Sequence, residues 1–565
     1  MERQGLNMKN VMRLIFCLLV LYICILPCFA ENPVVQTCYT ADPAPLVHDG
    51  VVYLYVGHDS SAAPNNSYLM RYYKCYSSKD MVNWTDHGIV LNMKSVSWSG
   101  GEANAAQVAY RNGSFYFYTS TNATGGIAIG VAVSKSPLGP FTDIGHPLIT
   151  ASQMNGCNAT HSWRGLDPAV FIDDDGQAYL YWGNNVLYWV KLNENMVSTS
   201  GTISCLDAKN AAFGPDFEEA PWVYKRYGKY YLVYASGFPE SIHYSMSSSP
   251  TGPWTYKGQI MKTQPGGVSN TIHPGVVDFQ GNSYFFFHNA GLPGGSSYRR
   301  SVCIEQFVYN EDGTIPLISE TSEGVINGVG NLDSYDTIQA ETICWGSGIE
   351  TKPCSDGGIM VTSISDGDYI KVKGVDFGIG VSGFEVRAAS GSSGGTIELR
   401  TGSQTGTLVG TCTITGTGGW NTWKTFQCDI TNCIGIKDFF LVFRGYGEPY
   451  RLNWYRFRRE ATSVSQDGND PWKHVSGNLN FSSGVELNVK GTTLFVKFAA
   501  SEGKPVTLKF YNMMGEVVRS EVLQTGFNNS RIYKCDISGI PSGFYIVKIV
   551  DRESVFHSSK VLVSH

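Results

Sequence analysis

The sequence predicts an all-β protein: a five-bladed β-propeller, then a β-sandwich, then a small C-terminal β-sandwich. Asn-Gly and Asp-Gly turns separate short runs rich in Tyr, Phe and Val, as is typical of hairpins. Helical periodicity is nearly absent from the 300 or so residues that hold these runs. A turn glycine recurs at positions 50, 113, 176, 228 and 281. Repetition at nearly constant spacing is typical of propeller blades, so five copies indicate five blades.

Each copy of the repeat begins with a polar residue near a proline. The clearest copy, residues 167–182, starts at Asp167, and equivalent positions hold Asp42, Glu219 and His273. Because equivalent positions of a propeller meet at its central channel, we expect these four side chains to gather at one end of it. Turn capping is the alternative, and it is the weaker one because buried like charges are costly unless they are used.

Composition limits the function classes. The 565 residues are 42% hydrophobic, 16% charged and 13% aromatic, with 63 glycines and a net charge of −6. This mixture suits several globular β domains with many tight turns. No long basic run is present, so the sequence predicts no nucleic-acid partner.

Residues 1–30 predict a secretory signal peptide. Lys9 and Arg13 precede an apolar run over residues 14–25, and the small Ala30 precedes a polar residue. The run is short for a membrane span, although a retained anchor is the alternative. Export therefore permits disulfides.

Three of the 14 cysteines lie in the signal segment, and the other 11 form no CxxC metal pattern. From proximity alone we expect Cys157 to pair with Cys205, and Cys344 with Cys354.

Changes of composition predict the domain boundaries. The propeller occupies residues 31–332, and the sandwich, where alternating strands replace the repeat, occupies 333–459. The polar residues 460–482 are predicted to form a linker. Alternation of apolar and polar residues resumes over 483–565 and predicts a third β unit.

Three carboxylates and a histidine around one channel point to acid–base chemistry on a neutral polar substrate. Cleavage of a glycosidic bond needs an acid for the leaving oxygen, and an inverting enzyme also needs a base that activates water. A third carboxylate raises the pKa of the acid. The rings of Trp98, Trp163 and Trp222 can stack on sugars, and core packing is an equal alternative for each.

Residues 40–316 resemble glycoside hydrolase family 43. The resemblance rests on Ala41-Asp42-Pro43, Leu166-Asp167-Pro168 and Glu218-Glu219-Ala220-Pro221. It implies that Asp42 is the general base, Glu219 the general acid, and Asp167 the residue that tunes and orients the acid. Glu219 is preferred to Glu218 because it directly precedes the small residue and proline, and neighbours on a strand face opposite ways.

The same resemblance implies further site residues. His273 is expected near an axial ion, Arg300 in the substrate site, and Glu240 and Trp222 against substrate. No cofactor is needed for the chemistry, and a calcium ion is allowed. The residues at 57–59, 75–84 and 309–316 are similar to those of arabinoxylan arabinofuranohydrolases. Asn104 stands where related members often carry an aromatic residue.

We therefore expect a secreted, inverting enzyme that removes α-L-arabinofuranosyl groups from arabinoxylan-type polysaccharide. A β-xylosidase or another family 43 specificity is the alternative among enzymes. A non-catalytic glycan-binding propeller is the rival class, and it has no need of a graded acid and base.

The second domain resembles carbohydrate-binding module family 6, through residues 338–341, 366–370 and 417–423. Trp420 is then the exposed sugar-stacking ring and Trp423 a core residue, while Gln339 and Glu341 are candidates for a structural calcium. Ser363 replaces a common aromatic, and Arg451 and Asn453 depart from the usual Asn and Asp, so a structural spacer is the alternative.

The last domain resembles the C-terminal sorting domain of type IX secretion, through residues 510–515, 542–548 and 560–563. The resemblance implies export by that machinery, with release or attachment at the cell surface. The expected partners are plant cell-wall polysaccharide and the secretion machinery. A plain accessory β domain is the alternative.

Overall fold

The structure is a computed structural model. It describes residues 31–64, 67–157, 159, 161–264, 269–378, 380–458, 486–490, 493–498, 506–512, 517–523, 531–541, 543–551 and 554–563. The predicted signal peptide and linker lie outside these residues. Within them the chain is all-β, and its only helices are three single turns of 3-10 helix: η1 (Met93–Ser95), η2 (Ala151–Gln153) and η3 (Ala211–Phe213). None of the described helices has the length or apolar character needed to cross a membrane.

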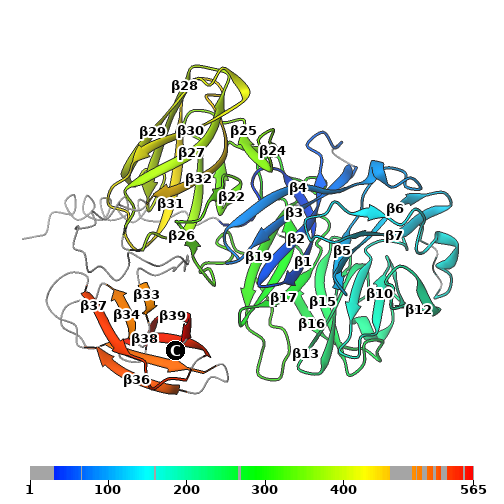
Figure 1. Ribbon diagram of the computed structural model, residues 1–565. Helices are drawn as coiled ribbons and strands as arrows, with labels where there is room; N and C mark the ends of the chain where they lie inside the picture. Colours follow the sequence, from blue (N-terminus) through cyan, green and yellow to red (C-terminus); the bar gives the residue numbers. More distant parts are fainter. Residues whose placement is uncertain are drawn as a thin grey trace, which may run out of the picture. The chain divides into compact units, whose positions relative to one another are not determined.

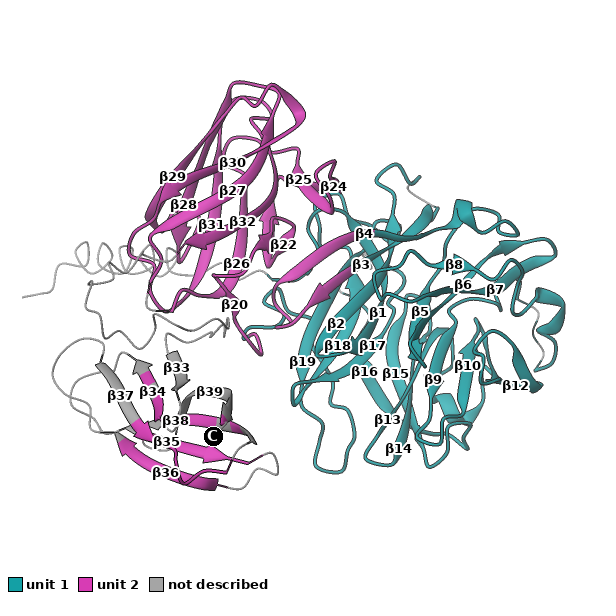
Figure 2. Cartoon of the chain, in the orientation of Figure 1, with its two compact units in different colours: residues 1–75, 89–327 teal, residues 76–88, 328–565 magenta. Residues whose placement is uncertain are grey.

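The chain divides into two compact units, residues 1–75 with 89–327 and residues 76–88 with 328–565 (Figure 2). Antiparallel sheets follow one another along the chain (Figure 1): β1–β4, β5–β8, β9–β12, β13–β16 and β17–β19. All of these strands belong to the first unit except the end of β3 and the start of β4, which lie in residues 76–88. Their bounds are β1 (Tyr39–His48), β2 (Val51–Asp59), β3 (Met70–Ser78), β4 (Trp84–Asn92), β5 (Ala106–Arg111), β6 (Ser114–Ala123), β7 (Gly126–Ser134), β8 (Thr142–Asp143), β9 (Ala169–Ile172), β10 (Ala178–Trp182), β11 (Val186–Leu192), β12 (Thr199–Asp207), β13 (Glu219–Arg226), β14 (Lys229–Ser236), β15 (Ser241–Ser247), β16 (Thr255–Met261), β17 (Gly275–Phe279), β18 (Asn282–Asn289) and β19 (Ser301–Phe307).

The repeated glycines form the turn between the first two strands of each sheet. Gly50, Gly113, Gly228 and Gly281 have φ between 73° and 81°, and the residue before each of them also has a positive φ. Two successive positive φ angles define the type I′ turn, whose twist matches that of a hairpin. The sequence repeat is therefore a repeat of hairpin chemistry.

The strand starts that carry the polar residues are irregular. The register of β1 against β2 shifts between Ala41 and Ala44, and that of β13 against β14 shifts between Glu219 and Trp222. Asp42 lies in the first shift with φ 54°, a conformation that non-glycine residues seldom adopt. Bulges of this kind re-aim side chains, here at the end of each sheet where the polar residues lie.

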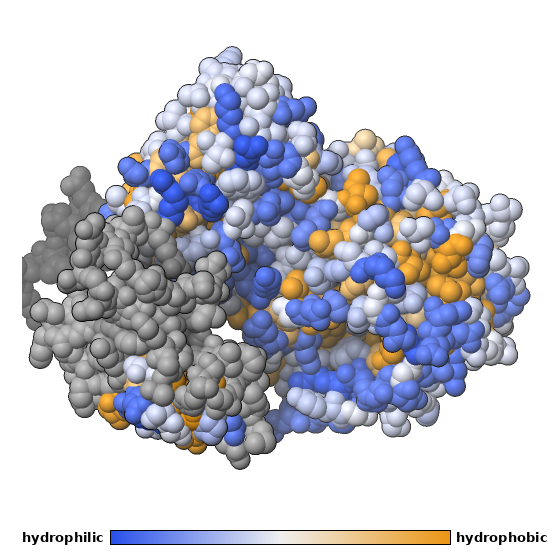
Figure 3. Space-filling model, viewed as in Figure 1, coloured by the Kyte–Doolittle hydropathy of each residue, from blue (hydrophilic) through white to orange (hydrophobic). Residues whose placement is uncertain are grey.

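Aromatic and aliphatic side chains fill the interior of the first unit. Tyr55, Tyr118, Trp182 and Tyr234 are all at most 1% exposed. On the face shown in Figure 3, hydrophobic residues of this unit are scattered among hydrophilic ones. Its apolar surface is thus buried mainly within and between the sheets, which gives the polar cavity described below a rigid frame.

The second unit contains a sandwich with the sheet orders β20-β26-β31-β28-β29 and β24-β25-β32-β27-β30. Strand β23 adds to β26, β21 adds to β32, and β22 pairs with the start of β4. The bounds are β20 (Leu332–Asp333), β21 (Ile338–Gln339), β22 (Thr342–Ile343), β23 (Trp345–Ser347), β24 (Glu350–Pro353), β25 (Ile359–Thr362), β26 (Tyr369–Asp376), β27 (Gly383–Ser390), β28 (Gly394–Thr401), β29 (Thr407–Thr415), β30 (Gly419–Asp429), β31 (Ile436–Arg444) and β32 (Arg451–Arg458). Alternate residues of both sheets face one shared core, as the sequence pattern predicts.

The C-terminal strands form two further sheets, with orders β33-β34-β37 and β36-β35-β38-β39. Their bounds are β33 (Glu486–Lys490), β34 (Thr493–Phe498), β35 (Val506–Tyr511), β36 (Val517–Leu523), β37 (Arg531–Asp536), β38 (Gly543–Asp551) and β39 (Ser554–Val563). Leu494, Phe510 and Val547 belong to a core shared by these strands. The alternation predicted for residues 483–565 is found in strands such as β34, β35 and β38.

The two predicted disulfides have different outcomes. Cys157 and Cys205 are bonded, as expected. The predicted Cys344–Cys354 pairing is wrong, because the structure joins neither residue in a disulfide. Cys344 lies between β22 and β23 and donates to Lys371 O in one sheet, whereas Cys354 follows β24 in the other. Closeness in sequence did not reveal that the chain changes sheets between them.

Candidate active site

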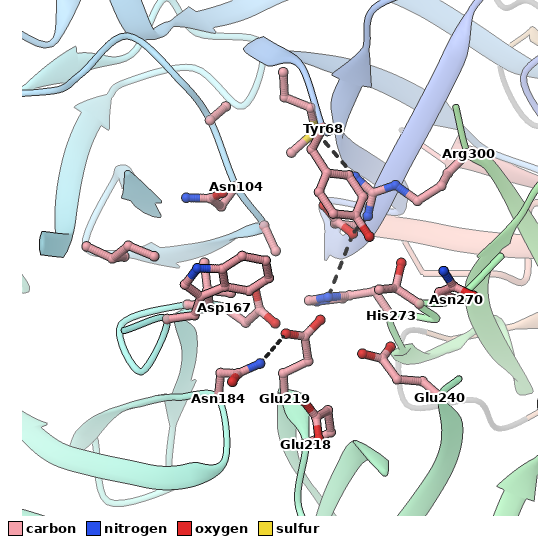
Figure 4. Close-up of a pocket in the computed structure, with 18 of the residues that line it drawn as sticks. Tyr68, Asn104, Asp167, Asn184, Glu218, Glu219, Glu240, Asn270, His273 and Arg300 are labelled. Carbon is pink, nitrogen blue, oxygen red and sulfur yellow. Dashed lines mark hydrogen bonds and ion pairs between the residues drawn. The ribbon is translucent and has the colours of Figure 1, made fainter. Parts of the chain in front are cut away.

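The residues that start the repeats line one cavity of about 560 Å³ in the first unit. Asp42 comes from β1, Glu219 from β13, and Asp167 and His273 from the segments before β9 and β17. Figure 4 shows the side chains of Asp167, Glu219 and His273 directed toward a common centre. The structure therefore brings together the four ionisable residues that the repeat singles out. Asn104, from the segment before β5, also lines the cavity.

Asp42 is 6% exposed and surrounded by nitrogen atoms. Its Oδ1 lies 2.8 Å from Arg300 Nη1 and 4.0 Å from His273 Nδ1. Its backbone N–H donates to His288 Nδ1, so that nitrogen is an acceptor and the ring of His288 is neutral. Burial raises the pKa of Asp42 to about 6, while Arg300 opposes the rise. Asp42 is thus a carboxylate that still binds a proton near neutral pH, as a general base does.

Arg300 is fixed by a second, fully buried carboxylate. The backbone N–H and Nε of Arg300 each donate to Asp59 Oδ2 at 2.9 Å, and Nη2 donates to Oδ1 at 3.0 Å. The ring of Tyr68 lies 4.9 Å from the guanidinium carbon. Arg300 is therefore pre-oriented toward Asp42, and Asp59 balances its charge.

Asp167 contacts the chain beside Glu219. Its Oδ2 accepts a hydrogen bond of 3.0 Å from Ala220 N, inside the irregular start of β13. Burial, followed by the charges of Glu219 and Asp42, raises the pKa of Asp167 well above its ordinary value. Asp167 thus holds the backbone that carries Glu219, and the ionisation of one carboxyl group disfavours the ionisation of the other.

Glu219 opens onto the cavity and is held by Asn184. Asn184 Nδ2 donates to Glu219 Oε2 at 2.7 Å. Burial raises the pKa of Glu219 to about 7, so the group is largely protonated below that pH. Glu218 also lines the cavity, and Asn185 donates to it at 3.1 Å. In Figure 4, Glu218 lies farther from the centre of the site than Glu219 does. This agrees with the opposite directions of neighbouring side chains along a strand.

Glu240 is a fourth acidic residue of the cavity, and it is 3% exposed. Its Oε2 accepts from Ile272 N at 2.7 Å, and its carboxyl group hydrogen-bonds with that of Glu219. Burial and the neighbouring Glu219 raise the pKa of Glu240 well above its ordinary value. Two carboxyl groups in contact can form a hydrogen bond only if at least one is protonated, and burial beside Glu219 favours the neutral form of Glu240.

The tryptophans named from the sequence have different surroundings. Trp163 is 50% exposed and lines the cavity, together with Phe238, which is 68% exposed. Trp222, predicted to bind substrate, is instead 5% exposed, packs in the core and donates to Val276 O. Trp98 packs against the same core and donates to Asp143. Exposed rings at the rim of a polar cavity suit a polysaccharide chain, which stacks its sugar faces on aromatic rings.

Two places in the chain are candidates for binding an ion, one beside His273 and one beside Glu341. Among the described residues, no group of three or more His, Cys, Asp or Glu side chains is arranged to hold a metal. Burial and the Arg300 charge lower the pKa of His273 to about 3, and that same charge disfavours a cation beside its ring. Glu341 is a better candidate for an ion ligand than His273. Its buried Oε2 has no hydrogen-bond partner, and burial raises the pKa of its carboxyl group to about 8. An unpaired buried carboxylate oxygen fits calcium, which prefers oxygen ligands.

The predicted sugar-binding ring of the sandwich is covered by its own chain. The guanidinium carbon of Arg451 lies 4.7 Å from the ring centre of Trp420. Glu448 accepts from Arg451 Nε at 3.1 Å and from Nη2 at 3.3 Å. Trp423, expected in the core, is only partly buried and donates to Ser355 Oγ. Gln339, in β21, pairs with Trp454.

Several residues of the site were not found from the sequence, namely Asp59, Tyr68, Asn184 and His288. Asp59 lies in a stretch that was noted only for its family likeness. The others occur once, at positions that the repeat does not mark, so no periodic signal identifies them.

Comparison with protein-family models matches residues 30–315 to glycosyl hydrolases family 43. Residues 339–459 match carbohydrate binding module family 6, and residues 490–564 match the secretion system C-terminal sorting domain. These matches agree with the three resemblances seen in the sequence.

Among curated proteins, the arabinoxylan arabinofuranohydrolase of Paenibacillus polymyxa is 34% identical over 75% of this chain and 73% of its own length. The arabinoxylan arabinofuranohydrolase of Bacillus subtilis (strain 168) is 35% identical over 75% of this chain and 91% of its own. A crystal structure of a glycoside hydrolase family 43 arabinoxylan arabinofuranohydrolase from Bacillus subtilis, in complex with cellotetraose, matches with a TM-score of 0.66 and 32% identity. That match covers 76% of this chain and 97% of the solved one.

Proposed function

Because this chain belongs to the glycosyl hydrolases of family 43, we propose that it removes α-L-arabinofuranosyl groups from arabinoxylan-type hemicellulose with inversion. The observation that carries the proposal is the pair of unequal carboxyl groups facing one cavity: Asp42 with a pKa of about 6 and Glu219 with a pKa of about 7. Relatives named for arabinose release from arabinoxylan supply the substrate class.

In the proposed mechanism Asp42 is the general base. Its carboxylate removes a proton from a water molecule as that water attacks the anomeric carbon. Arg300, held by Asp59, orients Asp42 and keeps it charged once the pH exceeds about 6. Neutral His273 and His288 surround Asp42 without adding charge.

Glu219 is the general acid and gives its proton to the leaving oxygen of the xylan-side sugar. Asp167 positions it through Ala220 N, and because the two carboxyl groups disfavour each other's ionisation, their proximity helps to keep a proton on the pair. Inversion requires room for water between base and acid, corresponding to carboxyl groups about 6.5–9.5 Å apart. We place the xylan chain along the rim at Trp163 and Phe238. Hydrolysis by two carboxyl groups needs no cofactor.

The accessory parts fit an exported polysaccharide-degrading enzyme. The sorting domain indicates secretion or localisation at the cell surface. We propose that residues 1–30 are the signal peptide, that the five sheets of residues 31–332 are blades of a propeller, and that residues 460–482 link the 333–459 and 483–565 domains. Glu341 and Gln339 would hold a structural calcium, and Trp420 would contact sugar once Arg451 moves.

The test is sugar release from arabinoxylan, arabinan and xylo-oligosaccharides, resolved by product. We expect arabinose from arabinoxylan, and proton NMR should show the inverted anomer first. Xylose as the main product would favour the β-xylosidase alternative, which relatives named xylosidase/arabinosidase keep open. Binding without any release would favour a non-catalytic propeller.

A further inference from the structure

Cys412 and Cys428 face each other across the edge of the sandwich. Cys412 lies in β29, the edge strand of one sheet, and Cys428 lies in β30, the edge strand of the other. An antiparallel bridge joins Gly410 to Ile430. Because antiparallel strands run in opposite directions, two residues farther along β29 lie opposite two residues back along β30. Continued for two residues, the register of this bridge brings Cys412 and Cys428 to facing positions on the two edge strands.

Both side chains point inward. Cys412 is fully buried in the core of the sandwich, and Cys428 is partly buried against the same core. The structure leaves the two thiols unbonded, but they lie close enough to interact, and that interaction raises the pKa of Cys412 and lowers the pKa of Cys428. Directly opposed residues have Cβ atoms about 4.5–5.5 Å apart, and a disulfide spans about 3.5–4.5 Å, so a small approach is enough to join them.

We propose that Cys412 and Cys428 form a disulfide in the exported protein. The bond would tie together the edge strands of the two sheets, where unpaired backbone groups otherwise face solvent. It would also close the segment that carries Trp420 and Trp423, the two tryptophans of the candidate sugar-binding region. Extracellular compartments permit such bonds, and the chain already contains Cys157–Cys205.

The chemistry is a thiol–disulfide exchange with an exported disulfide donor. The Cys428 thiolate attacks one sulfur of the donor, and the second donor sulfur leaves as a thiolate and takes up a proton. The Cys412 thiolate then attacks the Cys428 sulfur and releases the first donor sulfur as a thiol. Two protein thiols are oxidised, and one donor disulfide is reduced to two thiols.

The test uses the full chain, secreted into an oxidising compartment. The denatured protein is alkylated with N-ethylmaleimide without reductant, digested and mapped by mass spectrometry. We expect a cross-linked peptide that contains Cys412 and Cys428 and disappears after reduction. The Cys157–Cys205 peptide shows that oxidation was complete, and Cys433, buried in the same domain, should be alkylated throughout. Maleimide on both Cys412 and Cys428 beside an intact Cys157–Cys205 bond would overturn the proposal.

A second measurement compares thermal unfolding of the oxidised proteins. The double variant Cys412→Ser, Cys428→Ser should melt about 10 °C below wild type, because the unfolded chain loses a closed loop. Cys433→Ser is the matched control for removing a buried thiol. Equal midpoints for the double variant and the control would contradict a stabilising bond. If the double variant does not fold, the peptide map of the wild-type chain still decides.

Discussion

Asp59 binds Arg300 through three hydrogen bonds, and Arg300 in turn donates to Asp42 at 2.8 Å. The side chain of Asp59 is fully buried, so this pairing is shielded from solvent. Asp59, which does not line the cavity, thereby fixes the orientation of Arg300 and compensates its charge beside the general base.

Replacing Asp59 with Asn should move the acidic limb of the kcat/KM profile to lower pH. The negative charge of Asp59 raises the pKa of Asp42, so its removal lowers that pKa and weakens the base. We expect about a tenfold loss of kcat at the optimum, measured on a soluble aryl arabinofuranoside. Asp278→Asn removes an exposed partner of Arg226 and should leave the limb in place. An unchanged acidic limb in Asp59→Asn would show that Asp59 acts only in folding.

The wild-type enzyme should show a bell-shaped pH profile. Activity requires ionised Asp42 and protonated Glu219, so kcat/KM should rise through about pH 6 and fall through about pH 7. Because the two groups interact, the two limbs report the pair rather than single residues. Initial rates from pH 4.5 to 9 measure the profile. A plateau across the whole range is the contrary outcome.

Glu219→Ala should lower kcat/KM on arabinoxylan by about 10²–10⁴-fold while the fold is retained. An aryl arabinoside with a good leaving group should lose much less, because its departing oxygen needs little protonation. Glu218→Ala is the matched control on the neighbouring residue, and we expect a change of only a few-fold. A larger loss for Glu218→Ala than for Glu219→Ala would reverse the assignment of the acid.

Two substitutions of Glu240 test whether its carboxyl group is a neutral hydrogen-bond donor to Glu219 or a negatively charged neighbour of it. Glu240→Gln keeps a neutral hydrogen-bond donor beside Glu219, so the basic limb should stay nearly in place. Glu240→Leu removes the hydrogen bond that lowers the pKa of Glu219, so the basic limb should move to higher pH. The pH dependence of kcat/KM is the readout. A downward shift of about one unit in Glu240→Gln would mean that Glu240 is anionic in the wild type.

Arg451→Ala should strengthen binding of xylo-oligosaccharides by the sandwich several-fold, since it uncovers one face of Trp420. Glu448 keeps its bonds to Thr362 Oγ1 and Ser363 N, so the local fold should survive. Titration calorimetry on the full chain with Glu219→Ala, which prevents turnover, measures the binding. Trp420→Ala is the control and should weaken binding. If both variants bind as the parent does, the domain is a spacer.

Local sequence determined much of this protein. Type I′ hairpins need residues with positive φ, so Gly50, Gly113, Gly228 and Gly281 mark four of the first hairpins before any contact is known. Alternation of apolar residues marks the strands of both sandwich-like regions. In a repeat protein, equivalent positions of successive repeats lie close together in space. The spacing of the repeat alone therefore grouped Asp42, Asp167, Glu219 and His273.

Only the tertiary structure decided which side chains surround that group. Asp59 lies within a strand, and Asn184 lies in a turn, so no local rule distinguishes them from other polar residues. Burial separated Trp163 from Trp222, which the sequence treats alike. Sheet membership separated Cys344 from Cys354, and the bridge between Gly410 and Ile430 brought the strands of Cys412 and Cys428 together. Periodicity in sequence reports the direction of a side chain relative to its own strand, whereas contacts depend on how strands distant in sequence are paired and packed.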